Sequence, residues 1–193
     1  MAQPRRLILA SGSAYRKLLL ARLGLPFDVL APDVDETAPP GEAPADTALR
    51  LSLLKAKAVS QPGALIIGSD QVCSSGERRY GKPGSHEAAA QQLRELSGRS
   101  ADFHTAVTVL DSDTGKHDSR VVLCRVRFRD LEERRIQSYL EKEQPYDCAG
   151  AAKSEGLGIA LIAGMETDDP TSLVGLPLIA LSEMLERAGL PVL

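Results

Sequence analysis

Hydrophobic and polar residues alternate along this chain with two periods, one typical of strands and one typical of helices. Apolar runs at 5–10 and 64–68 predict buried strands, and two alternating segments, 102–110 and 119–128, predict a hairpin around a turn at 111–115. Helical spacing predicts helices at 14–23, 46–60 and 85–97, from a capping box at 130–133 to about 142, and from Pro177 to 188. With a further short strand at 159–162, this order of elements is that of an α/β protein.

The same pattern indicates which face each helix buries and where the chain cannot be regular. The predicted buried positions are Leu18, Leu19, Leu20 and Leu23 in the first helix, Leu49, Leu53, Leu54 and Ala58 in the second, and Leu178, Leu181, Met184 and Leu185 in the last. Between the first two helices, the segment 32–44 contains four prolines and one glycine. We therefore expect a loop there, and its carboxylates include Asp33, Asp35 and Glu36.

The composition narrows the class of protein. The chain has 193 residues, 43% of them hydrophobic and 25% charged, which is ordinary for a globular protein with its own core. A net charge of −3 argues against nucleic acid as a partner, because no basic excess is present to neutralise a phosphate backbone. The three cysteines have no metal-binding spacing and are expected to be free thiols. The apolar run near the N-terminus is too short for a signal peptide or a membrane span, so we expect a cytoplasmic protein.

Candidate chemistry begins directly after the first predicted strand, at Ser11, Ser13 and Arg16. A turn of small hydroxyl residues before a helix gathers backbone N–H groups and the positive end of the helix dipole, which suits a phosphate. Arg16 and Lys17 oppose that dipole, and a bound anion would resolve the conflict. An ordinary serine-capped helix explains these residues equally well.

Further candidates lie at predicted strand ends and in turns rich in glycine and proline: Glu36, Lys55, Asp70, Lys82 and the turn at 153–155. Cations and carboxylates in such places are what a metal–triphosphate substrate requires. Each also has a plainer interpretation. Asp70 could cap a loop, and Lys55 could be a solvated lysine, since Lys57 lies close by. The chain has no P-loop motif, and its histidines lack the spacing of metal ligands.

Eight segments taken together resemble the Maf family of nucleoside triphosphate pyrophosphatases over nearly the whole chain. In order, they lie at 9–17, 34–37, 55–59, 67–72, 81–83, 96–99, 148–150 and 174–178. The resemblance implies a single domain over 1–193. Its α/β fold would resemble that of inosine triphosphatases, with a long bent mixed sheet flanked by helices and two lobes that form a central cleft.

The resemblance also implies roles for individual residues. Asp70 would be the general base, or the carboxylate that holds the attacking water, and we expect its pKa to be near the reference value of ~4. The implied triphosphate-binding residues are Ser11, Ser13, Arg16, Lys55 and Lys82. Glu36 and Asp70 would hold a divalent metal, which could be Mg, Mn or Co. The reaction would yield a nucleoside monophosphate and pyrophosphate.

Three positions bear on the substrate within that family: Tyr15, Gln71 and Glu155. Their combination resembles the subgroup that hydrolyses 7-methyl-GTP, a clean-up activity on the nucleotide pool. A cationic N7-methylguanine would favour stacking on Tyr15 and a carboxylate such as Glu155. Two alternatives stay open: dTTP and UTP as substrates, or a nucleotide-binding regulator of cell division with little turnover. The partners implied are a small-molecule nucleotide and, by resemblance, a second copy of the chain in a homodimer, with no nucleic acid and no membrane.

Three positions depart from the family pattern. Ala14 stands where proline is usual, Tyr15 where the subgroup often has tryptophan, and Ala106 where glycine is common. None of them is the proposed acid or a phosphate-binding cation.

Overall fold

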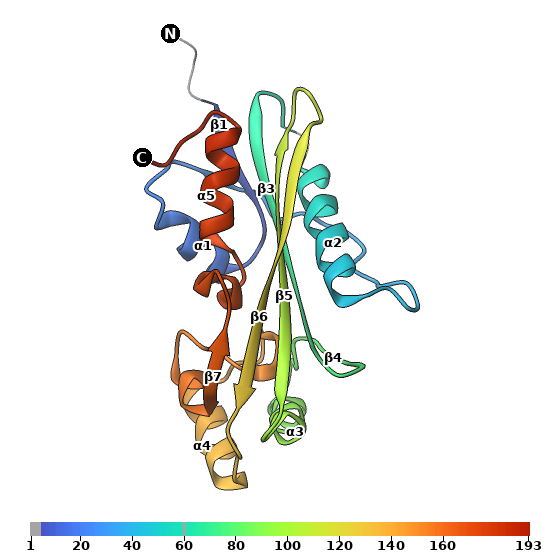
Figure 1. Ribbon diagram of the computed structural model, residues 1–193, viewed down its shortest axis with the longest axis vertical. Coiled ribbons are helices and arrows are strands. Elements are labelled where there is room, and N and C mark those ends of the chain that lie inside the picture. Colours follow the sequence, from blue (N-terminus) through green and yellow to red (C-terminus); the bar gives the residue numbers. More distant parts are fainter. Residues whose placement is uncertain (1–4, 60) are drawn as a thin grey trace. The chain divides into compact units, whose positions relative to one another are not determined.

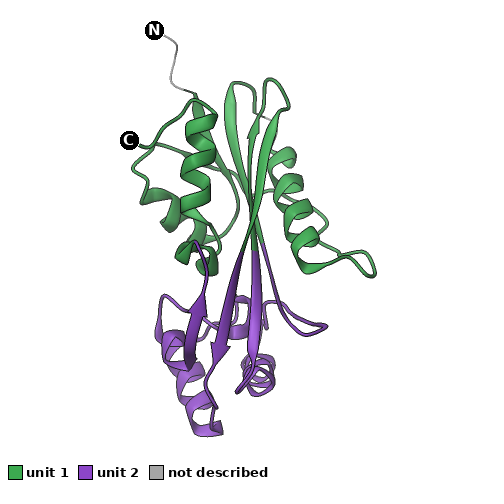
Figure 2. Cartoon of the chain, in the orientation of Figure 1, with its two compact units in different colours: residues 1–70, 105–122, 169–193 green, residues 71–104, 123–168 purple. Residues whose placement is uncertain are grey.

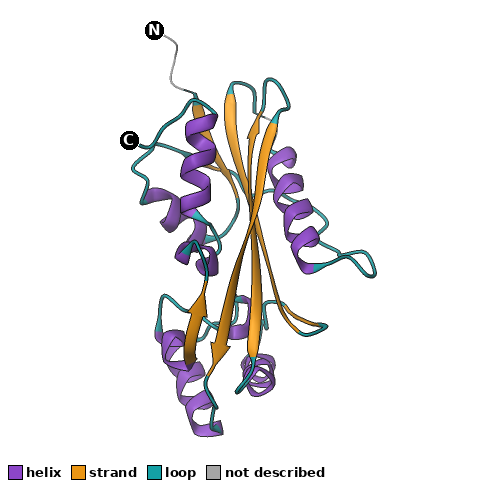
Figure 3. Ribbon diagram, viewed as in Figure 1, coloured by secondary structure: helices purple, strands orange, loops and turns teal. Residues whose placement is uncertain are grey.

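The computed structural model describes residues 5–59 and 61–193, and it confirms an α/β fold built on a mixed sheet (Figures 1 and 3). Over the described residues the sheet has seven strands in the order β2-β1-β3-β5-β6-β7, with β4 paired to β3. Strand β1 pairs in parallel with β2 and β3, whereas the pairs β3–β4 and β6–β7 are antiparallel. In chain order the elements are β1 (Arg6–Ala10), α1 (Ala14–Ala21), β2 (Asp28–Val29), α2 (Pro44–Ala58), β3 (Ala64–Ser75), β4 (Arg78–Tyr80), α3 (His86–Leu96), β5 (Ser100–Asp111), β6 (His117–Phe128), α4 (Glu133–Glu143), η1 (Ala149–Ala151), η2 (Leu157–Leu161), β7 (Ile162–Glu166), η3 (Pro170–Val174) and α5 (Leu178–Arg187).

The chain divides into two compact units, coloured separately in Figure 2. Unit 1 comprises 1–70, 105–122 and 169–193, and unit 2 comprises 71–104 and 123–168. Strands β3, β5 and β6 each contribute residues to both units. Within the described residues, no helix combines the length and the apolar character that crossing a bilayer requires.

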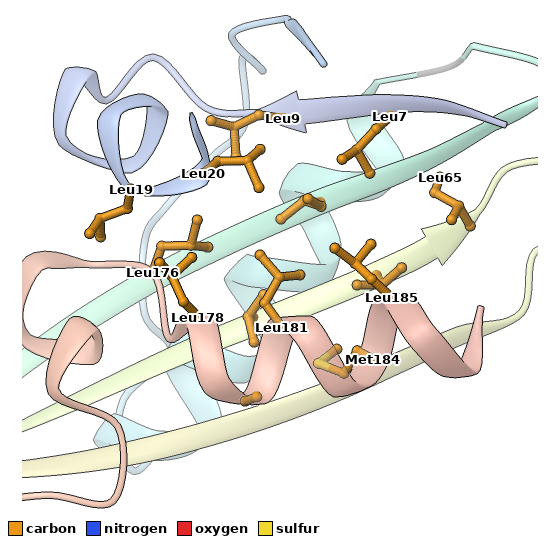
Figure 4. Packing of buried hydrophobic residues seen from close by; sticks show 14 residues of the cluster. Leu7, Leu9, Leu19, Leu20, Leu65, Leu176, Leu178, Leu181, Met184 and Leu185 are labelled. Carbon is orange, nitrogen blue, oxygen red and sulfur yellow. The ribbon is translucent and has the colours of Figure 1, made fainter. Parts of the chain in front are cut away.

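The core of unit 1 lies on both faces of β1 and β3. Side chains alternate along a strand, so Leu7 and Leu9 share one face, where they pack with Leu65, Leu181 and Leu185 from β3 and α5 (Figure 4). The opposite face carries a second cluster that includes Ile8, Ile66 and Ala56. Burial on both faces explains why these two strands are continuous apolar runs in the sequence.

The predicted helix faces are confirmed in part. In α5 all four predicted positions are buried. In α1, Leu19 and Leu20 are buried, but Leu18 is 68% exposed. In α2 the prediction is wrong for Leu54 and Ala58, which are exposed, whereas Leu49 and Leu53 are half-buried. The buried residues of α2 are Thr47, Ala48, Leu51, Ser52, Lys55 and Ala56. The predicted end of this helix at Ser60 lies outside the described residues.

Two predictions in unit 2 are also wrong in detail. The capping box at 130–133 does not form, because α4 begins at Glu133 and its N-cap, Glu132, makes no side-chain capping bond. Glu133 instead accepts hydrogen bonds from Arg94 and Gln137, which lower its pKa to about 2. The strand predicted at 159–162 is mostly the 3-10 helix η2, and β7 starts only at Ile162.

The cysteines behave as the sequence predicts. Cys73 and Cys124 are buried, Cys148 is half-buried, and all three are free thiols.

Candidate active site

The pairing of β1 with β3 places two groups of candidate residues at the same edge of unit 1. The strands are parallel, and Ala10, the last residue of β1, pairs with Gly68. Ser11 follows Ala10 directly, and Asp70 lies two residues beyond Gly68. The carboxyl end of β1 therefore lies beside the part of β3 that carries Asp70.

Asp70 does not stand at the end of its strand, as the sequence predicted. Strand β3 continues to Ser75 and pairs with β4, Cys73 opposite Tyr80. The short strand β4 was not predicted, and it extends β3 beyond the apolar run at 64–68. Asp70 thus lies inside a twelve-residue strand, just beyond the last residue that pairs with β1.

Lys55, Asp70 and Glu36 form an ion-paired cluster. The Lys55 ammonium donates to the Asp70 carboxylate at 2.6 Å and lies 2.7 Å from the Glu36 carboxylate. The side chains of Lys55 and Asp70 are each 9% exposed, whereas that of Glu36 is 60% exposed. Lys55 is therefore not a solvated lysine, and its neighbour Lys57 is the exposed one.

A glycine brings α2 close enough to β3 for this contact. Gly68 and Asp70 share one face of β3, because side chains two residues apart in a strand point the same way. A Cβ atom at Gly68 would clash with the carbonyl oxygen of Ser52 and lie 2.8 Å from the amide nitrogen of Ala56, so only glycine allows this approach. Lys55 follows Ser52 by three residues on the same helix face and thereby reaches Asp70.

The proline-rich loop that carries Glu36 is tied to α2. Arg50 donates from Nε and Nη2 to the two carboxylate oxygens of Glu42, at 2.7 and 2.9 Å, and from Nη2 to the carbonyl of Thr37 at 3.2 Å. The Asp35 side chain accepts the amide N–H of Thr37 at 2.9 Å. These bonds flank Glu36 on both sides of the loop and hold it near Lys55.

The turn after β1 positions Arg16. Ser13 is the N-cap of α1, and its hydroxyl accepts the amide N–H of Arg16 at 3.4 Å. The Ser11 hydroxyl, which is buried, accepts the amide N–H of Ser13 at 3.1 Å and Nη1 of Arg16 at 3.4 Å. The Arg16 Nε donates to the carbonyl of Gly175 at 2.8 Å. Among the described residues, these contacts use two of the five guanidinium N–H groups, and three remain for a phosphate.

Burial and neighbouring charges set the protonation of the site. Burial raises the pKa of Asp70 above its ordinary value, and the nearby Lys55 and Arg16 cations oppose this rise without cancelling it. The expectation of an ordinary pKa is therefore wrong. Burial lowers the pKa of Arg16, while the Asp70 and Glu36 carboxylates act in the opposite direction. A raised pKa makes Asp70 a stronger base once it is ionised.

This electrostatic balance predicts a pH profile. If Asp70 must be ionised to accept a proton, kcat/KM falls on the acidic side, with its midpoint above the ~3.9 of a free aspartate. Lys55→Met removes a cation that lowers the pKa of Asp70 and should move this acidic limb to higher pH. The control is Lys57→Met at the exposed neighbour, which should leave the limb in place. Coincident limbs for Lys55→Met and the unaltered protein would contradict the assignment.

The remaining predicted residues are described by their local surroundings. Tyr15 is half-buried in α1 of unit 1. In unit 2, Gln71 is a half-buried residue of β3, Lys82 is exposed in the turn after β4, and Glu155 is exposed just before η2. The Ser154 hydroxyl lies 3.5 Å from the Glu155 carboxylate. The roles predicted for these residues stay predictions.

Sequence reasoning missed a buried carboxylate, Asp169, which is 2% exposed. One of its oxygens accepts the amide and hydroxyl of Thr171, at 3.2 and 2.7 Å. The other accepts the amides of Ile179 and Ala180 at the start of α5, at 2.7 and 3.2 Å. An aspartate directly before Pro170 is a helix-start signal that could have revealed this role.

A cavity of about 490 Å³ lies in unit 2 and contains none of the predicted site residues. Its lining comes from α4 and η2: Arg134, Arg135, Ser138, Tyr139, Lys142, Leu157, Ala160 and Leu161. The candidate residues that the structure brings together, Glu36, Lys55 and Asp70, lie instead in the ion-paired cluster of unit 1.

Comparison with known proteins found a matching family and several similar proteins. The family described as Maf-like protein matches residues 6–188. The chain is 58% identical to a 7-methyl-GTP pyrophosphatase of Thiobacillus denitrificans over 97% of this chain and 94% of that protein. It is 57% identical to one of Cupriavidus pinatubonensis (96% and 94%) and 55% identical to one of Bordetella pertussis (98% and 95%). Among solved structures, a HAM1 protein from Coxiella burnetii aligns with a TM-score of 0.48 and 18% identity, covering 66% of this chain and 74% of that one.

Proposed function

This chain belongs to the family of Maf-like proteins, and from that premise we propose that it hydrolyses 7-methyl-GTP to 7-methyl-GMP and pyrophosphate. The observation that carries the chemistry is a buried carboxylate, Asp70, in direct contact with the Lys55 ammonium and influenced electrostatically by Arg16. The substrate follows from the relatives, which are named as 7-methyl-GTP pyrophosphatases at 52–58% identity.

The side chains of unit 1 can perform the reaction in one displacement. A water oxygen attacks the α-phosphorus of the triphosphate, and the water proton passes to the Asp70 carboxylate. The bond between the α-phosphorus and the oxygen that bridges to the β-phosphate breaks, and pyrophosphate leaves. Lys55 and Arg16 neutralise charge on the phosphate oxygens, and Ser11 and Ser13 position the turn that carries Arg16.

The donor set of the site fits a divalent metal such as Mg, Mn or Co. Glu36 and Asp70 both contact the single ammonium of Lys55, so their carboxylates converge on one cation, and they supply the oxygen ligands that such ions prefer. The described residues contain no group of three histidine, cysteine, aspartate or glutamate side chains that could hold a metal, so water and phosphate oxygens would complete the coordination. When bound, the metal would supply charge neutralisation at the phosphates.

We assign the base specificity to Tyr15, Gln71 and Glu155, and a further phosphate contact to Lys82. Because N7-methylguanine is positively charged, an aromatic face and a carboxylate bind it in preference to the neutral guanine of GTP. For Tyr15, Gln71 and Lys82 these assignments rest on the family resemblance of the segments at 9–17, 67–72 and 81–83, and for Glu155 on the resemblance of the turn at 153–156 to the 7-methyl-GTP subgroup.

A nucleotide panel tests the proposal. We expect 7-methyl-GTP to release pyrophosphate faster than GTP, dTTP or UTP, and a chelator to abolish the release. Tyr15→Leu should reduce the preference for 7-methyl-GTP over GTP by about 5- to 30-fold, the equivalent of a desolvated cation–π contact of about 1–2 kcal/mol. Tyr15→Phe, which keeps the aromatic face, is the matched control and should retain most of the preference. Faster turnover of dTTP or UTP would replace the proposed substrate with the alternative.

We also propose that residues 1–193 act as one domain in the cytoplasm, with a small-molecule nucleotide as the partner rather than nucleic acid or a membrane. The family match from residue 6 to residue 188 includes segments of both units and supports the single domain. The net charge of −3 argues against nucleic acid. A homodimer is proposed from the family resemblance.

A further inference from the structure

The loop before α5 carries a backbone carbonyl that is shared by two donors. The Gly175 carbonyl accepts Nε of Arg16 at 2.8 Å and the hydroxyl of Ser69 at 2.9 Å. Gly175 has a φ of +114°, a conformation that side-chain-bearing residues rarely adopt. The direction of this carbonyl is therefore set by a turn that glycine permits and by the two hydrogen bonds that the carbonyl accepts.

Ser69 is well placed to hold the carbonyl. It is fully buried in β3, directly before Asp70. Neighbouring residues of a strand point to opposite faces, so Asp70 faces Lys55 on α2 while Ser69 faces the Gly175 loop. One short piece of β3 thus fixes both the carboxylate and, through Gly175, the guanidinium of Arg16.

We propose that Ser69 is a positioning residue for hydrolysis: by donating to the Gly175 carbonyl, it orients that carbonyl to hold the Arg16 guanidinium toward the triphosphate. This inference rests on the proposed function, because it requires Arg16 to bind the triphosphate. A guanidinium recognises phosphate through a planar fork of N–H groups, and this geometry makes its binding sensitive to small rotations.

The same loop provides a matched control. Thr105 is also fully buried, and its hydroxyl donates to the carbonyl of Ser172 at 2.9 Å. Thr105→Val removes a buried hydroxyl bond to this loop, as Ser69→Ala does, but at a carbonyl that does not accept the Nε of Arg16. A purely structural role for Ser69 would make the two variants behave alike.

The test is a double-mutant cycle on kcat/KM with 7-methyl-GTP. We expect Ser69→Ala to lower kcat/KM by about three- to tenfold, the loss of one neutral hydrogen bond, chiefly through a higher KM. In an Arg16→Ala background the same change should have less than about a twofold effect, because the residue through which Ser69 acts is gone. Thr105→Val should leave kcat/KM unchanged, and thermal melting of each variant checks folding. If Ser69→Ala does not fold, Ser69→Cys, with a weaker donor, replaces it in the cycle.

The outcomes separate the two proposals. Equal effects of Ser69→Ala with and without Arg16, or an equal loss of activity in Thr105→Val, would overturn the positioning role while leaving the proposed function intact. Absence of pyrophosphate release by the unaltered protein from every nucleotide of the panel would instead overturn the proposed function.

Discussion

Replacing Asp70 by asparagine is expected to lower kcat by about 10²- to 10⁴-fold, the range typical of losing a general base. Asparagine has nearly the same shape but cannot accept the proton of the attacking water. Nucleotide binding should persist, because Arg16 and Lys55 stay in place to contact the phosphates. Pyrophosphate release measures the first effect, and calorimetric titration with a non-hydrolysable 7-methyl-GTP analogue measures the second.

Asp28→Asn is the matched control for this exchange. Asp28 also belongs to unit 1, but it lies in β2, is 52% exposed and pairs with Arg6 at the surface. Its exchange should leave kcat within about twofold, since surface ion pairs contribute little. If Asp70→Asn kept near-normal turnover while the unaltered protein was active, another group would have to be the base, such as Glu36, whose carboxylate also contacts Lys55.

The same variant distinguishes an enzyme from a nucleotide-binding regulator. If the protein is an enzyme, the unaltered protein and Asp70→Asn should both bind nucleotide, but only the unaltered protein should hydrolyse it at a substantial rate. A regulator of cell division would bind nucleotide in both forms and show little turnover in either.

Around the candidate site, the sequence predicted correctly only the local structure that neighbouring residues determine. Ser13 directly precedes the helix it caps, so its role follows from neighbouring residues alone. The turn between β1 and α1 likewise depends on a few adjacent small residues. Roles of this kind need no knowledge of which distant segments pack together.

The partnership of Lys55 with Asp70 could not be predicted in this way. Lys55 and Lys57 are only two positions apart, and the face of α2 that the leucine pattern predicts to be buried is half-buried or exposed in the structure. The buried face of α2 is instead the one on which small residues allow the helix to approach β3. This approach depends on two separate segments of the chain, so neither segment alone predicts it. The raised pKa of Asp70 follows from that same burial.

The full length of β3 could not be predicted from the sequence for a similar reason. Polar residues at Ser69, Asp70 and Gln71 interrupt the apolar run and resemble the end of a strand. The strand continues because β4 pairs with its second half, and a partner of only three residues gives almost no sequence signal.

The close packing of α2 on β3 is expected to matter for both stability and activity. Gly68→Ala should lower the free energy of unfolding by about 3 kcal/mol, at the upper end of the usual cost of overpacking, because the new methyl would clash with the carbonyl oxygen of Ser52. For a chain of this size that corresponds to a melting temperature lower by about 10 °C. Activity should fall as well, since a displaced α2 would draw Lys55 away from its 2.6 Å contact with Asp70. Urea denaturation and pyrophosphate release measure the two effects.

Gly81→Ala is the control that shows whether the loss of stability in Gly68→Ala is specific to the close approach of α2. A Cβ atom at Gly81 has no neighbour within 4 Å and φ there is not positive, so the added methyl should change stability by less than about 0.5 kcal/mol. Alanine in place of an unconstrained glycine often stabilises a protein, because it restricts the unfolded chain. A large loss of stability in Gly68→Ala would therefore reflect the clash with α2 and not the exchange of glycine for alanine as such. A Gly68→Ala protein that melts normally but is inactive would mean that α2 shifts at little cost and that the Lys55–Asp70 distance alone controls turnover. Normal stability together with normal activity would instead contradict the view that this glycine brings the two residues together.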